Sequence, residues 1–168
     1  MPRIYFSGNN LDYEDCAEIL QELFAYRDYY QEKYGRAYKI MLVPISKSGT
    51  TMETMACFLH FYNQLSNVDN IRLKGAVVTD LRADIEKSPL LQLANKFNWP
   101  QFDIKEGIGG RFSVMTAPGL LALVALGGDV DAFLRGAREM DEQCQQVVAK
   151  ENPAFINALL KDLAYKND

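Results

Sequence analysis

The spacing of apolar and polar residues predicts alternating strands and helices over the first two thirds of the chain. A strand is expected at residues 4–6, where β-favouring side chains stand directly before a turn cluster. A long helix is expected over residues 12–34, because apolar residues recur there at intervals of three and four. The chain therefore opens with a strand, a turn and a helix.

The same alternation continues further along the chain. Residues 39–45 predict a second strand, and residues 51–65 predict a helix with one apolar face. Residues 76–79 predict a third strand, residues 90–97 another helix and residues 101–104 a fourth, short strand. Strands that alternate with helices form a parallel sheet flanked by helices, so we expect an α/β fold.

After the fourth strand the pattern changes to a glycine-rich stretch and then to helices alone. Pro118 suits the first turn of a helix, and Asp129 and the pair Asn152-Pro153 can start two more helices. The C-terminal third is therefore expected to be a helical annex. Because no repeat, low-complexity tract or long linker separates two parts, residues 1–168 are expected to form a single domain.

The composition narrows the classes of function. Apolar residues make up 48% of the chain and charged residues 24%, which is ordinary for a globular protein. The formal net charge is −4 and Lys and Arg form no dense block, which argues against a nucleic-acid partner and a polybasic membrane anchor. Three widely spaced cysteines fit reduced intracellular thiols better than disulfides or a metal site. We expect a cytoplasmic protein that binds a small molecule.

The first candidate site is the loop 46–51, where the strand 39–45 ends and a helix begins. In α/β proteins, anions bind at the carboxyl ends of strands and at helix N-termini. Hydroxyls, a positive charge and a flexible backbone come together in Ser46, Lys47, Ser48, Gly49, Thr50 and Thr51. The loop lacks the spacing of a nucleotide P-loop, so a phosphate monoester suits it better. Alternatively Ser48 or Thr50 simply caps the helix, and Glu53 closes a capping box.

The second candidate site is the glycine-rich stretch 106–113, which follows the fourth strand and so lies on the same edge of the sheet. Paired glycines would let the backbone approach a ligand, and the guanidinium of Arg111 could stabilise negative charge on a phosphate or a reacting oxygen. Alternatively the glycines form only a turn, and Arg111 pairs with Glu106 or Asp103. The pattern leaves both interpretations open.

Taken together, the two stretches resemble the bacterial type of glucose-6-phosphate isomerase. The resemblance rests on SKSGTTMET at residues 46–54 and GGRFSVMTAPGLL at residues 109–121, in this order and separation. It extends over nearly the whole chain, through residues 4–11 and 151–154. It implies a sugar isomerase (SIS) domain, which is a flavodoxin-like parallel sheet flanked by helices.

Enzymes of this family interconvert glucose 6-phosphate and fructose 6-phosphate, in glycolysis and gluconeogenesis, without a metal or an organic cofactor. A carboxylate moves a proton between C1 and C2 through a cis-enediolate. The resemblance implies that Arg111 is a catalytic residue that stabilises the enediolate. The phosphate-binding residues that it implies are Ser46, Lys47 through its backbone, Ser48, Thr50 and Thr51. The supporting residues are Glu53, Gly109 and Gly110.

The chain also departs from the family pattern. A Gly-Ile-Gly-Gly-Ser turn that completes the family's phosphate site has no counterpart here, and the family's base glutamate, ring-opening histidine and late lysine fall beyond Asp168. We therefore expect a phosphosugar-binding domain that is inactive alone, whose partners are the second SIS domain of the same enzyme and further copies in a homo-oligomer. The alternatives are a stand-alone SIS module that senses a phosphosugar and a purely structural subunit. His60, Cys57 and Trp99 are expected in packing roles.

Overall fold

The chain divides into two units, Met1–Leu126 and Gly127–Asp168, in a computed structural model that describes residues 2–10 and 12–167. The first unit carries all the strands of the described residues, and the second is helical. The prediction that residues 1–168 form a single domain stays a prediction.

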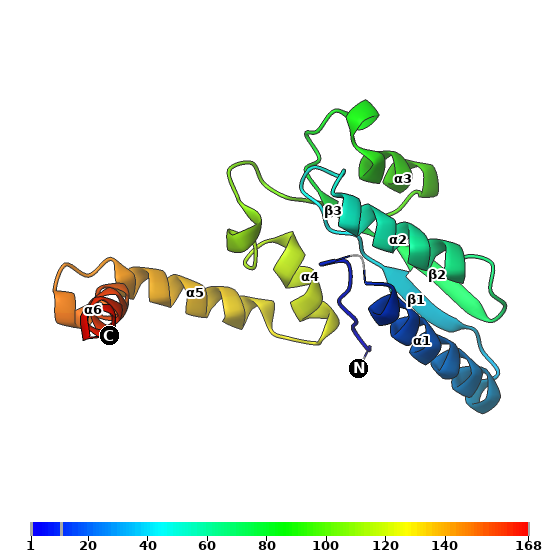
Figure 1. The fold of residues 1–168 in the computed structure, drawn as a ribbon, viewed down its shortest axis with the longest axis horizontal. Coiled ribbons are helices and arrows are strands. Elements are labelled where there is room, and N and C mark those ends of the chain that lie inside the picture. The colour runs from blue at the N-terminus through cyan, green and yellow to red at the C-terminus, as the bar shows by residue number, and fades with distance from the viewer. Residues whose placement is uncertain (1, 11, 168) are drawn as a thin grey trace. The chain divides into compact units, whose positions relative to one another are not determined.

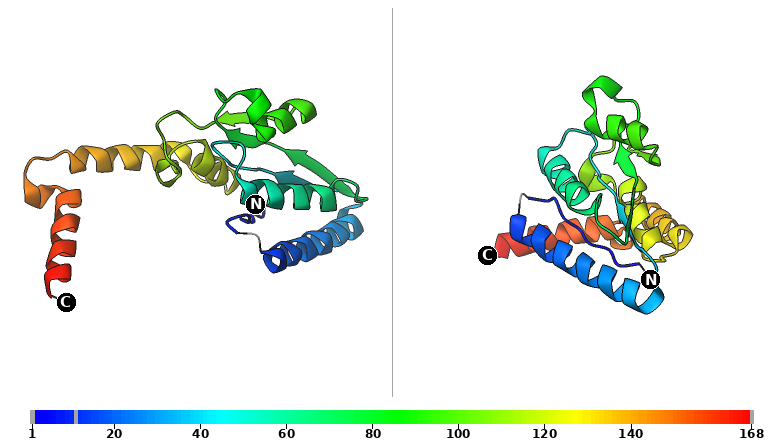
Figure 2. Two further views of the ribbon diagram at one scale, coloured as in Figure 1. Left: turned by 45° about the horizontal axis from the view of Figure 1, so that its top comes forward. Right: turned by 90° about the vertical axis from the view of Figure 1, so that its right-hand side faces the viewer.

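The first unit is an α/β arrangement, which confirms the predicted fold class (Figure 1). Its helices are α1 Tyr13–Tyr34, α2 Met52–Leu65, α3 Pro89–Phe97 and α4 Ala117–Ala125. Its strands are β1 Tyr38–Leu42, β2 Ile71–Gly75, β3 Val77–Thr79 and β4 Gln101–Asp103. Helix α2 lies between α1 and α3 along the strands (Figure 2).

The strands pair in parallel, β1 with β2 and β3 with β4. The terminal register pairs of the two ladders are Tyr38↔Ile71 and Leu42↔Gly75, and Val77↔Gln101 and Thr79↔Asp103. An isolated bridge between Ile45 and Val78 joins the two pairs, and the Ala76 N–H donates to the Leu42 carbonyl at 3.0 Å. Strands β2 and β3 therefore run one after the other between β1 and β4.

The N-terminal segment differs from the prediction, because residues 4–6 form no strand. The segment runs along α1 instead, where the Arg3 guanidinium lies 3.8 Å from the centroid of the Tyr26 ring and 3.6 Å from Glu22. Tyr5 packs against the core cluster beneath this helix. A β-favouring sequence becomes a strand only where another strand accepts its backbone hydrogen bonds, and here the contacts of the segment go to a helix.

Strand β2 was not predicted from the sequence. The exposed side chains of Arg72 and Lys74 alternate in it with the half-buried Ile71 and Leu73. Alternation with a period of two is typical of a strand that buries one face only. The two charged residues break up the apolar run that identified the other strands.

The main core of the first unit lies between α1, α2 and β1. Its buried side chains are Cys16, Leu20, Leu23, Ile40, Cys57, Phe61 and Leu65. The burial of Cys57 confirms its predicted packing role. Trp99 also packs as predicted, because its ring stacks on Phe97 with centroids 5.1 Å apart and covers Gly75, where an added Cβ would meet it at 2.4 Å.

The second unit consists of α5 Val130–Cys144 and α6 Pro153–Asn167, joined through a short 3-10 turn. Asp129 caps α5 by accepting a hydrogen bond from the Ala132 N–H at 2.9 Å, and the Asn152 side chain accepts one from the Phe155 N–H at 3.0 Å. Both predicted helix starts are thereby confirmed. Among residues 127–166 of this unit, no side chain is buried. Within the described part of the chain, no helix is long and apolar enough to cross a membrane.

Candidate functional site

The loop 46–51 begins on the sheet and ends on a helix, as the sequence predicted. The Ser46 N–H donates to the Val78 carbonyl at 3.0 Å, which extends the pairing of the first strand into the loop. Thr51 is the N-cap of α2, and no side chain caps this helix. The capping box that was considered for Glu53 is therefore not formed, and the N–H groups of the first helical turn have no partner within the helix.

The hydroxyl groups of the loop are held mainly by one another. The buried Ser46 Oγ lies 2.7 Å from Thr51 Oγ1. Ser48 Oγ accepts hydrogen bonds from the Thr50 N–H at 3.2 Å and from the Thr50 hydroxyl at 2.9 Å. A cluster of rotatable hydroxyls thus stands at the positive end of the α2 dipole, where an anion is favoured.

Gly49 brings the loop backbone onto the start of α3. Its φ of +70° belongs to the left-handed region, and an added Cβ would come within 2.1 Å of Ser88 Oγ and 3.4 Å of Thr79 Oγ1. Ser88 is 1% exposed, and its Oγ has no hydrogen-bond partner among the described residues. A side chain at position 49 would therefore be disfavoured by both the backbone conformation and the lack of space.

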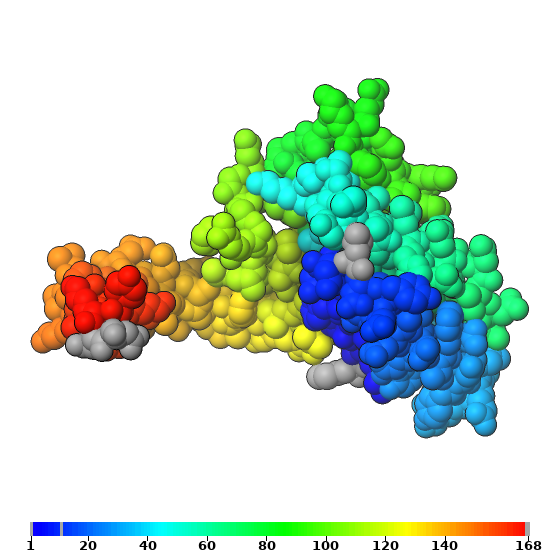
Figure 3. All heavy atoms as spheres, viewed as in Figure 1, coloured from blue at the N-terminus to red at the C-terminus, as the bar shows by residue number. Residues whose placement is uncertain are grey.

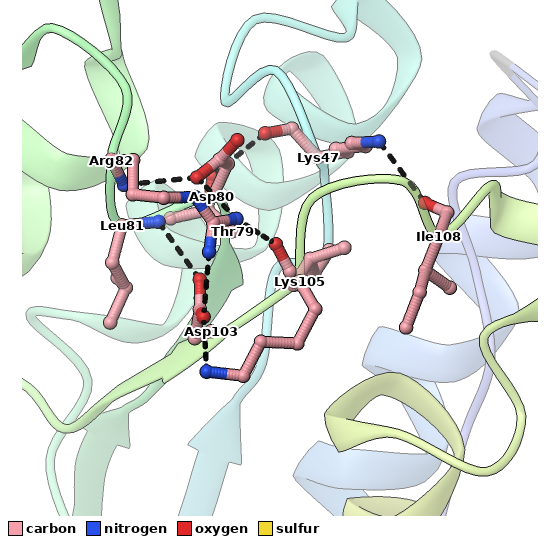
Figure 4. A network of polar contacts seen from close by, with 9 residues as sticks. Lys47, Thr79, Asp80, Leu81, Arg82, Asp103, Lys105 and Ile108 are labelled. Carbon is pink, nitrogen blue, oxygen red and sulfur yellow. Dashed lines mark hydrogen bonds and ion pairs between the residues drawn. The ribbon is translucent and has the colours of Figure 1, made fainter.

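Lys47 connects the first loop with the second (Figure 4). Its ammonium donates to the Ile108 carbonyl at 3.1 Å. Its own carbonyl accepts hydrogen bonds from the Asp80 N–H at 3.2 Å and from the Thr79 hydroxyl at 3.4 Å. The side chain of Lys47 thus holds the glycine-rich stretch, while its backbone belongs to the loop 46–51.

The second loop leaves β4 and passes through a short 3-10 turn, Gly110–Phe112, before α4 begins. The Ser113 hydroxyl closes this turn by donating to the Gly110 carbonyl at 2.7 Å. Arg111 lies in the turn and is exposed. Among the described residues Arg111 forms no ion pair with Glu106 or Asp103, and Asp103 pairs with other cations instead.

Asp103 forms ion pairs with two cations. Arg82 lies 3.2 Å from the Asp103 carboxylate, and Lys105 lies 3.0 Å from it. The hydrogen bond from Lys105 is the main cause that lowers the pKa of the Asp103 carboxyl below its usual value, and the Leu81 N–H and the charge of Arg82 act in the same direction. Arg82 also pairs with Asp80 at 2.8 Å. This charged network at the ends of β3 and β4 was not predicted from the sequence.

Both predicted stretches line one cavity of about 250 Å³. The two loops reach the surface of the first unit, where they are coloured cyan and yellow-green in Figure 3. The cavity brings together four of the predicted site residues, Ser46, Lys47, Thr51 and Gly110. The remaining predicted residues adjoin lining residues in sequence without lining the cavity themselves; they are Ser48, Thr50, Glu53, Gly109 and Arg111.

Sequence reasoning missed several lining residues. Thr54, Ile104 and Pro118 also line the cavity, as does Ser113 from within the predicted second stretch. Thr54 directly follows Glu53 and Ser113 lies within the second stretch, whereas Ile104 ends the predicted fourth strand and Pro118 was singled out only as a helix start. Within the described part of the chain, no three His, Cys, Asp or Glu side chains gather where they could hold a metal ion.

His60, which was expected in a packing role, lies on α2 with its ring centroid 6.1 Å from that of Tyr13 and 6.0 Å from that of Phe61. The residues that line the cavity do not include it. Its surroundings are those of a packed aromatic residue.

Comparisons with known proteins identify relatives of one family. The family model described as phosphoglucose isomerase matches residues 32–167. Glucose-6-phosphate isomerase of Methanocaldococcus jannaschii is 37% identical over 116 residues, which cover 69% of this chain and 27% of that protein. Glucose-6-phosphate isomerase of Lactococcus lactis subsp. cremoris MG1363 is 31% identical over 169 residues, which cover 98% of this chain and 34% of that protein.

The chain thus spans about a third of the length of the curated relatives that it matches. Among solved structures, a hypothetical protein from Thermus thermophilus aligns with a TM-score of 0.60 and 24% identity, over 91% of this chain and 48% of that one. This likeness bears on the fold alone.

Proposed function

The chain belongs to the phosphoglucose isomerase family, and from this premise we propose that its first unit binds the phosphate group of a phosphosugar in the cavity between the two loops. One observation carries the proposal. Two stretches that lie about sixty residues apart, joined by a Lys47–Ile108 hydrogen bond with a sequence separation of 61, line a single cavity. The names of the relatives indicate glucose 6-phosphate as the ligand, and fructose 6-phosphate is the isomer that the sequence resemblance implies.

The loop 46–51 supplies hydrogen-bond donors and partial positive charge for a phosphate group. The hydroxyls of Ser46 and Thr51 line the cavity, and those of Ser48 and Thr50 stand beside them. The first N–H groups of α2 add donors and a partial positive charge. Hydrogen bonds to a charged group contribute about 1.5–3 kcal/mol each, so a few of them suffice for specific binding.

In this proposal Arg111 faces the sugar end of the ligand. It follows Gly110, which lines the cavity, and the exposed guanidinium is free of the ion pair with Asp103 that the sequence allowed. A guanidinium beside the reacting carbons would stabilise the negative oxygen of an enediolate. Glu53 and Gly109 would support the two loops.

We propose further that this chain alone binds phosphosugar without turning it over. Isomerisation needs a positioned base as well as an electrostatic stabiliser. The relatives are about three times as long as the matched stretch, so the remaining groups of such an enzyme would come from its other parts. A second SIS domain and further copies in a homo-oligomer are the partners that this proposal includes.

The test is a titration of the chain with fructose 6-phosphate, inorganic phosphate and unphosphorylated fructose, followed by the melting temperature. A ligand at a hundred times its dissociation constant stabilises the folded state by about 2.7 kcal/mol. We expect stabilisation by both phosphate compounds and none by fructose. Ser48→Ala and Arg111→Ala should each weaken the effect of fructose 6-phosphate.

Ser66→Ala is the matched control, because Ser66 is an exposed serine at the opposite end of the same helix. It should leave the titration unchanged. Absence of any stabilisation by phosphate or fructose 6-phosphate, or equal effects of Ser48→Ala and Ser66→Ala, would overturn the proposed function.

A further inference from the structure

Arg82 joins the ends of two neighbouring strands through both of its terminal nitrogens (Figure 4). Nη2 lies 2.8 Å from the Asp80 carboxylate and donates to the Ile104 carbonyl at 2.6 Å. Nη1 donates to the Asp103 carboxylate at 3.2 Å. A planar guanidinium can serve these three acceptors at once, whereas the compact ammonium of a lysine cannot reproduce the fork.

The contact with Ile104 fixes the first residue of the loop that carries Arg111. The Ile104 N–H donates to the Thr79 carbonyl at 2.9 Å, and its carbonyl is held by Arg82, so both of its backbone groups are bound to the β3 end. The Ile104 side chain is 5% exposed and lines the cavity. The start of the second loop is therefore fixed at this point.

The same turn also supports the other loop. The Asp80 N–H and the Thr79 hydroxyl donate to the Lys47 carbonyl, and the Lys47 ammonium reaches the Ile108 carbonyl. Residues 79–82 thus contact the loop 46–51 on one side and the start of the second loop on the other. A displacement of this turn would change the distance between the two loops.

The two carboxylates of the network are partly sheltered from solvent, and the guanidinium is more exposed. The side chains of Asp80 and Asp103 are 23% and 20% exposed, and that of Arg82 is 43% exposed. Charge-assisted hydrogen bonds between partly buried groups are stronger and better oriented than isolated ion pairs on the open surface. The hydrogen bond from Lys105 lowers the pKa of the Asp103 carboxyl, so the carboxylate stays charged to a lower pH than an ordinary aspartate would.

We propose that Arg82 is a positioning residue for Arg111: without lining the cavity itself, it fixes the start of the loop 104–113 relative to the loop 46–51. The inference rests on the proposed function, because it concerns the placement of Arg111 against a phosphosugar. It adds a residue that neither the sequence motifs nor the cavity lining identifies.

The test compares the dissociation constants of fructose 6-phosphate and inorganic phosphate for the full chain by calorimetric titration. The variants are Arg82→Gln, Arg82→Lys, Arg111→Ala and the double substitution Arg82→Gln with Arg111→Ala. Arg82→Gln and Arg82→Lys should weaken fructose 6-phosphate binding about tenfold, which is a free-energy loss of about 1.4 kcal/mol. Binding of inorganic phosphate should change less than about twofold, because the loop 46–51 keeps its own hydrogen bonds.

The double substitution distinguishes positioning from general stability. If Arg82 acts through Arg111, Arg82→Gln should have little further effect once Arg111 is alanine. Arg72→Gln, at an exposed arginine of β2, is the matched control and should bind like the unsubstituted chain. Arg82→Lys retains the charge, so its dissociation constants still test the inference if Arg82→Gln folds poorly.

The outcomes separate the two proposals. If the unsubstituted chain binds neither phosphate nor fructose 6-phosphate, the proposed function fails, and this inference fails with it. If the chain binds and Arg111→Ala weakens binding, but both Arg82 variants bind normally or lose only melting temperature, this inference alone is overturned. An undiminished effect of Arg82→Gln in the Arg111→Ala background overturns it as well.

Discussion

Replacement of Gly49 by alanine should strongly destabilise the first unit, for two separable reasons. The φ of +70° places the residue in the left-handed region, which costs an L-residue about 1–2 kcal/mol. The new Cβ would also lie 2.1 Å from Ser88 Oγ, so the buried start of α3 must move. Forcing an extra carbon into packed space costs about 1–3 kcal/mol. The two effects together predict a loss of about 2–5 kcal/mol.

Gly35→Ala provides the matched control. Gly35 follows α1 with a φ of +60°, and an added Cβ there would have nothing within 4 Å. This substitution carries the conformational cost alone, so the difference between the two variants measures the collision with Ser88. Adding Ser88→Ala to Gly49→Ala should recover about 1 kcal/mol or more, since it removes the nearest atom. Ser88→Ala alone should be close to neutral, because its buried hydroxyl has no partner among the described residues.

The assay is urea unfolding followed by the fluorescence of Trp99, the single tryptophan of the chain. Trp99 packs between Gly75 and Phe97 and therefore reports on the first unit. With an m-value of about 1–3 kcal/mol/M, the predicted loss moves the midpoint by about 0.7 M or more. A Gly49→Ala variant as stable as Gly35→Ala, or no recovery on adding Ser88→Ala, would refute the reasoning.

Two further predictions concern ionisation and thiol reactivity. The pKa of the Asp103 carboxyl is lowered below 3.8 in the folded state, first by the Lys105 hydrogen bond, so its stabilising contribution is present above pH 3.8 and is lost as the pH falls through the folded pKa. The stability difference between the chain and Asp103→Asn, measured as urea midpoints, should therefore shrink below about pH 4 and would argue against this account if it stayed constant. Of the three cysteines, the half-exposed Cys144 should react first with an aromatic disulfide reagent, because the other two are buried and burial raises the pKa of the Cys57 thiol. Two or more rapidly reacting thiols in the folded chain would contradict this expectation.

The helices could be predicted from the sequence because their signals are local. Apolar residues recur at helical spacing, and the caps at Asp12 and Asp129 stand where the helices begin. The strands were harder, because pairing depends on distant segments. Strand β2 was missed since Arg72 and Lys74 occupy its exposed face. Residues 4–6 were wrongly predicted as a strand, whereas Tyr5 packs against the core and the neighbouring Arg3 contacts α1.

The position of the candidate site could also be predicted from the sequence, whereas the contacts between its distant segments could not. Both loops were expected at one edge of the sheet because parallel strands present their carboxyl ends together, and a shared cavity lies between them. The individual roles of the site residues stay predictions. No local pattern could indicate that the Lys47 ammonium would bind the Ile108 carbonyl or that Arg82 would bridge two strand ends, since these contacts depend on how distant segments meet.

The mutual pairing of hydroxyls in the loop 46–51 affects which protonation state of a ligand it would favour. Each hydroxyl carries one hydrogen that can rotate about the C–O bond. Here the Thr50 hydroxyl donates to Ser48, and one of the hydroxyls of Ser46 and Thr51 donates to the other. A phosphate dianion only accepts hydrogen bonds, so it would draw these hydrogens outward by rotation, with the backbone left in place. A protonated phosphate or an alcohol would bring hydrogens of its own and compete for the same acceptors. In the proposed function, the loop would therefore favour the fully ionised ester.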